Sequence, residues 1–209
     1  MSRDIFNRAF RIGVAGPVGC GKTTLIEAMT RRFGPSYSIG IITNDIYTKD
    51  DAVYLAGQGI TTPDRIRGVE TGDYPHVAIR EDTTLNLEAI AILEESVPGV
   101  EIVFIESGGD NLAAFFSADL ADITIFLLDV AGGDRTPRKG GPGMVRSDLL
   151  IINKIDLASR VGASLSAMET ESRRVRGERP VIMTNMKSGE GMSALYTWLQ
   201  SLLTARLGH

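Results

Sequence analysis

Cysteine is scarce in this chain, and basic residues are fewer than acidic ones. Cys20 is the only cysteine among the 209 residues, which excludes a disulfide within the chain and favours a reducing compartment. Lys and Arg number 22 against 26 Asp and Glu, so the formal net charge is −4 at pH 7, and no dense basic block occurs. Because proteins that bind nucleic acids or anionic membranes non-specifically usually carry a basic face, we expect neither partner.

Long hydrophobic runs are also missing. The apolar stretches have the length of strands, well below the ~20 residues that a membrane-spanning helix needs. Met1–Arg11 mixes charged and apolar residues and lacks the apolar core of a signal peptide. We therefore expect a cytoplasmic protein. Since 43% of its 209 residues are hydrophobic, the chain can bury a core without disulfides, and we expect a single domain over residues 1–209.

The sequence instead contains a regular alternation of short apolar runs and helical patterns. The runs expected as strands are Phe10–Ala15, Tyr37–Ile42, Glu101–Ile105, Ile123–Val130, Leu149–Asn153 and Val181–Thr184. Helices are expected from near Lys22, after Asp82, over Ala158–Val175 and over Met192–Leu207. This alternation predicts an α/β fold with a mainly parallel central sheet covered by helices on both faces. Tyr47–Arg80 and Ala131–Arg146 show neither pattern and are expected to be long irregular loops.

A glycine-rich segment follows the first predicted strand and opens a predicted helix. Gly16-Pro17-Val18-Gly19-Cys20-Gly21-Lys22-Thr23 matches the pattern GxxxxGK[ST] of a P-loop, and Thr24 follows it. Glycines let successive backbone N–H groups turn toward phosphate oxygens, and the helix N-terminus adds partial positive charge. Lys22 can neutralise the β- and γ-phosphates, and the Thr23 hydroxyl can bind Mg²⁺. The pattern therefore predicts the nucleotide site of a P-loop NTPase.

Cys20 lies inside this loop, where two interpretations are open. A small side chain can simply fill space, or the helix N-terminus can lower the pKa of the thiol and make it reactive. We treat Cys20 as a filler residue.

Acidic residues follow two of the predicted strands. Glu106 follows the strand Glu101–Ile105, and Gly109 comes three residues later. An acid at this position beside a P-loop holds the water shell of Mg²⁺, and the backbone N–H of Gly109 can approach the γ-phosphate. Asp45 follows the second predicted strand and can orient the attacking water or reach Mg²⁺. The residues expected to act in hydrolysis are Lys22, Asp45, Glu106 and Gly109, with Thr23, Asp45 and Glu106 at the Mg²⁺.

The apolar run Leu149–Asn153 leads into Asn153-Lys154-Ile155-Asp156, the pattern Asn-Lys-x-Asp. A carboxylate accepts two N–H bonds from the N1/N2 edge of guanine, and adenine offers no such pair, so Asp156 predicts a preference for GTP over ATP. Asn153 can tie this loop to the P-loop, and the stem of Lys154 can lie across the base. Asn185 and Lys187 follow the last predicted strand, in a second loop that can cover the other side of the base.

Together these motifs resemble the family of urease accessory G proteins, UreG, which are nickel-delivery GTPases of the P-loop class related to HypB. The resemblance covers nearly the whole chain. Its segments are Gly16–Thr24, Thr43–Thr48, Gly68–Gly72, Ala78–Asp82, Glu106–Leu112, Pro137–Gly143 and Asn153–Leu157. It implies a slow GTPase that uses GTP and Mg²⁺ and forms a homodimer around nucleotide and metal. It also implies insertion of nickel into apo-urease together with other urease accessory proteins.

One position departs from the family pattern. The family has Cys-Pro-His after Glu-Thr-Gly, and its Cys and His bind the metal at the dimer interface, whereas this chain has Tyr74 in place of the cysteine and keeps His76. A neutral tyrosine with a pKa of ~10 does not replace a thiolate ligand. Three outcomes stay open: Ni²⁺ or Zn²⁺ binds through His76 with Asp73 or Glu70, it binds far more weakly, or the metal role is lost or changed.

Two further functions are compatible with parts of the sequence. A nucleotide-dependent interaction module would use the same site with incidental turnover, and the replacement at Tyr74 favours it. A P-loop kinase of a small metabolite would share Gly16–Thr23 but has no need for Asn153–Asp156. A preference for ATP over GTP would identify the kinase.

Overall fold

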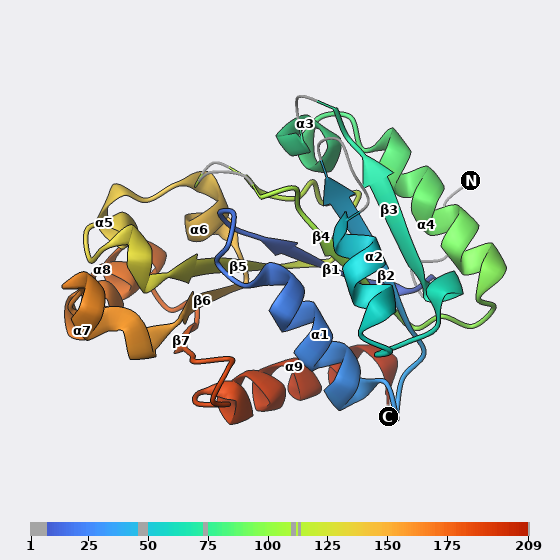
Figure 1. Ribbon diagram of the computed structural model, residues 1–209. Coiled ribbons are helices and arrows are strands. Elements are labelled where there is room, and N and C mark those ends of the chain that lie inside the picture. The colour runs from blue at the N-terminus through green and yellow to red at the C-terminus, as the bar shows by residue number, and fades with distance from the viewer. Residues whose placement is uncertain (1–7, 46–49, 73–74, 110–111, 113, 209) are drawn as a thin grey trace.

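The computed structural model describes residues 8–45, 50–72, 75–109, 112 and 114–208. Its centre is a seven-stranded sheet in the order β3-β2-β4-β1-β5-β6-β7, and all six pairings between these strands are parallel (Figure 1). The strands are β1 Phe10–Ala15, β2 Ile39–Asp45, β3 Ile66–Glu70, β4 Ile102–Glu106, β5 Ile123–Asp129, β6 Leu149–Asn153 and β7 Val181–Met183. The predicted α/β fold with a parallel central sheet is confirmed.

Helices cover both faces of the sheet, as the sequence predicted (Figure 1). One face is packed by α1 Lys22–Phe33, α2 Asp50–Gly57 and α9 Met192–Leu207. The other is packed by α3 Pro75–Arg80, α4 Thr84–Ser96, α6 Pro142–Arg146, α7 Ala158–Val161 and α8 Leu165–Arg176. Short helical segments complete the chain: α5 Thr136–Lys139 and the 3₁₀ turns Pro63–Arg65, Val130–Gly132 and Ile155–Leu157.

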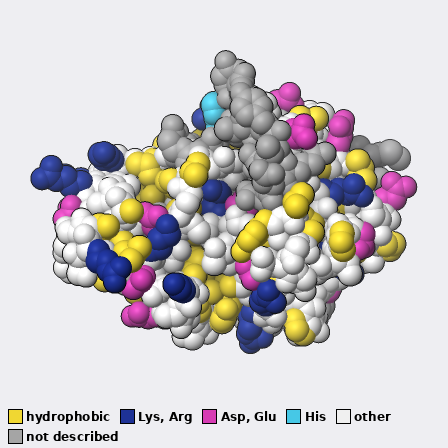
Figure 2. Space-filling model, viewed as in Figure 1, with side chains coloured by type: hydrophobic (Ala, Val, Ile, Leu, Met, Phe, Trp, Pro, Cys, Tyr) yellow, Lys and Arg dark blue, Asp and Glu magenta, His cyan; other side chains and the backbone are white. Residues whose placement is uncertain are grey.

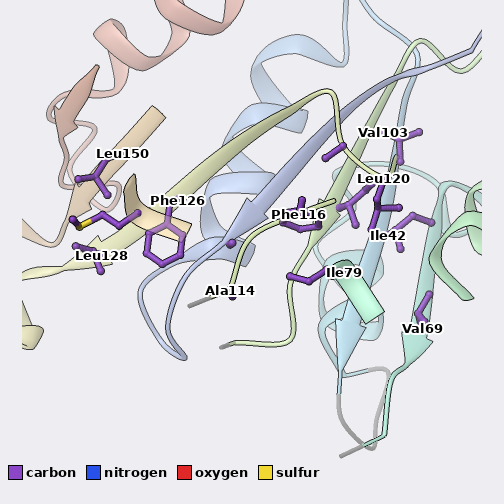
Figure 3. Packing of buried hydrophobic residues seen from close by; sticks show 14 of the residues in the cluster. Ile42, Val69, Ile79, Val103, Ala114, Phe116, Leu120, Phe126, Leu128 and Leu150 are labelled. Atoms are coloured by element: carbon purple, nitrogen blue, oxygen red, sulfur yellow. The ribbon is translucent and has the colours of Figure 1, made fainter. Parts of the chain in front are cut away.

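The strand sequences divide their side chains between two apolar clusters. In β4, Ile102 and Phe104 join the cluster under α1 and α9, while Val103 and Ile105 join the opposite one, part of which Figure 3 shows. Successive strand residues point to opposite faces, so an unbroken apolar strand supplies both layers. Each fully buried Leu, Ile or Phe stabilises the fold by roughly 1.5–3 kcal/mol, which explains why the strands are nearly continuous in apolar residues.

The sheet also needs small residues where a neighbour approaches closely. A Cβ on Gly13 would lie 2.5 Å from the Phe116 ring, and one on Gly40 would lie 2.4 Å from Leu93. Both glycines therefore let a side chain of the covering layer pack directly onto the strand backbone.

The expectation that Tyr47–Arg80 forms an irregular loop is wrong. Its described part contains α2, a 3₁₀ turn, β3 and α3. β3 was missed because only Ile66 and Val69 are buried apolar residues in it, and its other positions include Arg67 and Gly68. Pairing with β2, rather than its own pattern, makes this segment a strand.

Two further boundaries differ from the predictions. Ala131–Arg146 is not irregular, because it contains the short helices α5 and α6, which begin with proline at their first or second residue. Ala158–Val175 is not one helix, because Gly162 ends α7 in the left-handed region and Ser164 caps α8 by accepting from Ala167 N. The second strand runs over Ile39–Asp45 rather than Tyr37–Ile42, which brings Asn44 into the sheet.

None of the described helices combines the length and apolar character that crossing a bilayer requires. On the face shown in Figure 2, Lys and Arg side chains occur among Asp and Glu side chains.

Candidate nucleotide site

The P-loop connects β1 to α1 at the carboxyl edge of the sheet, where parallel α/β folds bind ligands (Figure 1). Gly21 is the N-cap of α1, and no side chain caps this helix end. The backbone N–H groups in the first turn of α1 can therefore donate to another acceptor, such as phosphate oxygens.

A cavity of about 460 Å³ lies directly beside this loop. It is lined by Val18, Gly19, Gly21, Lys22, Thr23, Thr24, Asn44, Glu106, Ser107, Gly108 and Gly109. A larger cavity of about 720 Å³, lined by residues such as Thr30, Tyr37 and Arg65, lies near the amino end of β2 and contains none of the predicted site residues. The smaller cavity is the candidate phosphate site, because it gathers the P-loop and the end of β4.

Lys22 is buried at the edge of this cavity, with a relative exposure of 7%. Its Nζ donates to the backbone oxygen of Pro17 at 3.3 Å, and no carboxylate forms an ion pair with it among the residues described. A buried ammonium without an anion is stabilised by a phosphate, so the position suits the predicted role.

Glu106 and Thr23 meet at the floor of the cavity. Glu106 ends β4 and is 1% exposed, and its Oε1 accepts a hydrogen bond from Thr23 Oγ1 at 2.7 Å. A hydroxyl and a buried carboxylate are the oxygen donors that Mg²⁺ prefers, so this pair fits the ion. Gly109 faces Lys22: a Cβ at this position, where φ is +84°, would lie 3.6 Å from Lys22 Nζ.

Asp45 is placed only by its backbone. It is the last residue of β2 and pairs with Glu70 of β3. Its side chain lies outside the described residues, and its predicted contact with water or Mg²⁺ stays a prediction.

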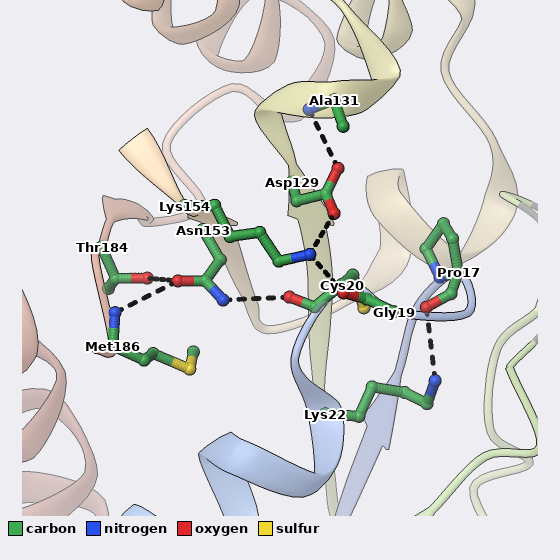
Figure 4. Close-up of polar contacts among 10 residues, drawn as sticks. All are labelled: Pro17, Gly19, Cys20, Lys22, Asp129, Ala131, Asn153, Lys154, Thr184 and Met186. Atoms are coloured by element: carbon green, nitrogen blue, oxygen red, sulfur yellow. Dashed lines mark hydrogen bonds and ion pairs between the residues drawn. The ribbon is translucent and has the colours of Figure 1, made fainter. Parts of the chain in front are cut away.

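Asn153 joins the second motif to the P-loop. Its Nδ2 donates to the backbone oxygen of Cys20 at 3.0 Å, and its Oδ1 accepts from Thr184 Oγ1 and from Met186 N (Figure 4). One side chain therefore connects the P-loop, the end of β6 and the loop after β7. The sequence predicted the first of these contacts.

Lys154 makes a contact that the sequence did not predict. Its Nζ donates to Gly19 O at 2.6 Å and pairs with Asp129 Oδ2 at 3.0 Å (Figure 4). Asp129 also accepts from Ala131 N, so its carboxylate is fixed at the end of β5. Asp129 was missed because the predicted strand ran on to Val130, although an acid that ends an apolar strand is a recognisable signal.

Asp156 lies two residues beyond Lys154 and is exposed. Its carboxylate has no hydrogen-bond or ion-pair partner among the described residues, so both of its oxygens can accept from a ligand. In the facing loop, Asn185 uses its Oδ1 to accept from Lys187 N and Ser188 N, which shapes the turn. Lys187 itself is exposed.

Cys20 is buried behind the P-loop, with a relative exposure of 1%. Burial raises the pKa of its thiol to about 11, although Lys22 acts in the opposite direction. The interpretation as a reactive thiol is therefore wrong, and the filler role agrees with the packing.

The structure describes only two of the predicted transition-metal ligands. His76 is exposed on α3 and Glu70 is exposed at the end of β3, while Asp73 and Tyr74 lie outside the described part of the chain. No group of three or more His, Cys, Asp or Glu suited to a metal occurs in the described ranges.

The P-loop and its surroundings match a known protein family. Residues 10–183 match the family described as "CobW/HypB/UreG, nucleotide-binding domain". The chain belongs to this family. As a member of the CobW/HypB/UreG family, it is a P-loop nucleotide-binding domain of the GTPase type, and the family groups it with metal chaperones.

Solved structures of HypB have the same fold as this CobW/HypB/UreG member. HypB from Archaeoglobus fulgidus is 24% identical, with a TM-score of 0.77 over 93% of this chain and 90% of that chain. HypB from Helicobacter pylori, solved in complex with nickel, is 20% identical, with a TM-score of 0.75 over 92% and 86% of the two chains. A LAO/AO transport system kinase is 20% identical, with a TM-score of 0.61 over 95% of this chain and 61% of that chain.

Proposed function

We propose that this chain is a GTP hydrolase in which Asp156 selects guanine. The observation that carries the proposal is the Asn153 bridge, which holds the Asn-Lys-x-Asp loop against the P-loop through Cys20 O. A base in this loop would therefore belong to a nucleotide whose phosphates lie beside Lys22. The Asp156 oxygens are unpartnered among the described residues, so they can accept both N–H bonds of the guanine edge.

We assign a different role in hydrolysis to each residue of the site. Lys22 and the N–H groups at the start of α1 bind the phosphates and lower the cost of charge on the γ-phosphoryl group. The Gly109 backbone approaches the same group, and Asp45 is the candidate for orienting the attacking water. Mg²⁺, which Thr23 and Glu106 would hold, would neutralise charge on the phosphate oxygens.

Nucleotide competition tests the base assignment. A fluorescent GDP derivative bound to the protein is displaced with unlabelled GTP, GDP, ATP or ADP in Mg²⁺ buffer. GTP and GDP should displace it at concentrations at least a hundredfold lower than ATP and ADP, because adenine leaves the Asp156 carboxylate without donors. Preference for ATP would identify a kinase-like protein and overturn the proposal.

We further propose that hydrolysis is coupled to delivery of nickel into apo-urease, with other urease accessory proteins and a homodimer as the working assembly. The UreG-like motifs and the family membership support this role. The nickel-bound HypB adds that a protein of the same fold handles this ion. His76, with Asp73 or Glu70, is the proposed ligand set for Ni²⁺ or Zn²⁺.

Metal titration in two nucleotide states tests the delivery step. Ni²⁺ affinity is measured by calorimetry with GDP and with a non-hydrolysable GTP analogue, and the mass in solution is recorded for the same samples. The proposal expects tighter Ni²⁺ binding and a dimer in the GTP-analogue state. Equal affinity in both states would remove the switch, because a ligand without differential affinity shifts no equilibrium.

A nucleotide-dependent interaction module is the second candidate. The replacement of the family cysteine by Tyr74 favours it, because the thiolate ligand is lost. In this case the mass in solution should depend on the nucleotide and be unaffected by Ni²⁺ or Zn²⁺.

A further inference from the structure

Two buried asparagines form a reciprocal amide pair between β2 and α4. Asn44 Nδ2 donates to Asn86 Oδ1 at 3.0 Å, and Asn86 Nδ2 donates to Asn44 Oδ1 at 2.8 Å. Both side chains are 0% exposed. Burying two amides in an apolar layer costs free energy unless their polar atoms are paired, so this arrangement must be fully satisfied to persist.

The remaining N–H groups of the pair are bonded to two different elements. Asn44 donates to the backbone oxygen of Glu106 at 2.9 Å, and Asn86 donates to the backbone oxygen of Ala78 at 3.0 Å. Because a carbonyl oxygen can only accept, these two bonds fix which way each amide points. The pair therefore links the end of β4, the end of β2 and α3.

The two ends of this link have different chemistry. At one end, Glu106 bonds Thr23 through its carboxylate, and Asn44 lines the phosphate cavity. At the other end, Ala78 lies two residues after His76 in α3, which sits beyond the carboxyl ends of β2 and β3 (Figure 1). The pair thus connects the cavity to the helix that carries the proposed metal ligand.

We propose that Asn86 is a positioning residue that couples the nucleotide state of the cavity to the position of α3. This inference rests on the proposed function only in requiring that a nucleotide binds beside Glu106. When Thr23 and Glu106 rearrange around nucleotide and Mg²⁺, the Glu106 carbonyl carries Asn44 with it. Asn86 and the Ala78 backbone then move with Asn44. If they did not, the hydrogen bonds of the two side-chain amides would break and leave buried polar groups unpaired in a close-packed interior.

A second connection between the site and α3 does not pass through Asn86. Ser117 N donates to Ile79 O at 2.8 Å, and the Arg80 guanidinium lies over the Phe115 ring, so the segment after β4 also contacts α3 without involving Asn86. Substitution of Asn86 removes the amide route and leaves this backbone bond in place.

Hydrogen exchange of the α3 amides tests the coupling. Exchange is measured by mass spectrometry with GDP and with a non-hydrolysable GTP analogue, both with Mg²⁺, for the wild type, Asn86→Leu and Asn86→Ala. Asn86→Leu is similar in size but cannot donate, and Asn86→Ala leaves room for a water if the leucine variant does not fold. Ile90→Val is the matched control, since Ile90 is 0% exposed on the same helix and belongs to the apolar cluster on this face of the sheet.

The inference predicts that α3 exchanges at different rates in the two nucleotide states of the wild type and of Ile90→Val. In the Asn86 variants this difference should fall at least fivefold, with GDP affinity within about twofold of wild type by calorimetry. A residue with a merely structural role would raise exchange in both states and leave the difference unchanged.

The same samples separate the failure of this inference from that of the proposed function. If both nucleotides bind but the difference persists in the Asn86 variants, or is missing from the wild type, Asn86 does not couple the sites and the GTP hydrolase proposal stands. If neither nucleotide binds, both are overturned.

Discussion

Gly21 and Asn153 are in such close contact that a side chain at position 21 would have to displace the Asn153 amide. A Cβ on Gly21 would lie 2.6 Å from Asn153 Nδ2, the atom that donates to Cys20 O. Gly21 also has φ +107°, which side-chain-bearing residues rarely adopt. The P-loop and the Asn-Lys-x-Asp loop therefore depend on each other's geometry.

Gly21→Ala should weaken GDP binding by on the order of tenfold to a hundredfold, because it displaces the Asn153 bridge and strains the first turn of α1 by about 1–3 kcal/mol. Calorimetry with GDP measures the effect. Gly99→Ala is the control, since Gly99 also has a positive φ of +79° but nothing lies within 4 Å of the point that its Cβ would occupy. It should lower stability and leave GDP affinity unchanged; equal losses in both variants would show that the Asn153 contact is unimportant.

Glu106→Gln tests the carboxylate of the cavity. The amide oxygen can still accept from Thr23 Oγ1, so the fold should be kept, while the negative charge is lost. We expect the Mg²⁺ concentration for half-maximal GTP hydrolysis to rise about 10- to 100-fold. The control Glu95→Gln neutralises an exposed acid on α4 and should match the wild type. An unchanged Mg²⁺ requirement in Glu106→Gln would place the ion elsewhere.

Cys20 should make stability fall at high pH. Burial raises the pKa of its thiol from 9.0 to about 11, so between these values the folded protein keeps a proton that the unfolded chain has lost. The unfolded chain binds fewer protons in this window, and the free energy of unfolding therefore decreases as pH rises, by up to about 1.4 kcal/mol per pH unit. The wild type should lose stability relative to Cys20→Ser between pH 9 and 11 in urea denaturation. Parallel curves for the two proteins would contradict the buried thiol.

The affinity for Ni²⁺ should depend on the residue at position 74. Tyr74→Cys restores the thiolate ligand of the family pattern, and we expect it to tighten Ni²⁺ binding by about tenfold or more, equivalent to about 1.4 kcal/mol. The control Tyr54→Cys adds a thiol at an exposed tyrosine of α2 and should give no gain. Combining Tyr74→Cys with His76→Ala should cancel the gain. If Tyr74→Cys binds Ni²⁺ no better than the wild type, the interface has diverged from metal binding.

The sheet was predictable where each strand is apolar throughout. β1, β4 and β6 are buried at every position, and their boundaries could be read to within a residue. β3 could not, because an edge strand with two buried apolar residues owes its form to pairing with β2. Gly162 ends α7 and Ser164 begins α8. Both signals are present in the sequence, but the surrounding helical pattern led to the prediction of one continuous helix.

The candidate site, like the sheet, was only partly predictable from the sequence. The P-loop and Asn153–Asp156 are local motifs, so the sequence alone located them. Asp129 and Asn86 are single polar residues whose partners lie 25 and 42 positions away, so the sequence does not show which residues they contact. Long-range polar contacts of this kind become visible only when the fold brings the elements together.

Asp156→Asn measured against xanthine nucleotides tests the central claim most directly. An asparagine cannot accept both N–H bonds of guanine, but its amide can donate to the C2 oxygen of xanthine while its carbonyl accepts from N1–H. We predict that the variant, with an unchanged unfolding midpoint, binds GDP about 100-fold more weakly, a loss of roughly 3 kcal/mol, and binds XDP better than the wild type does. Unchanged GDP affinity in this variant would contradict the selection of guanine by Asp156.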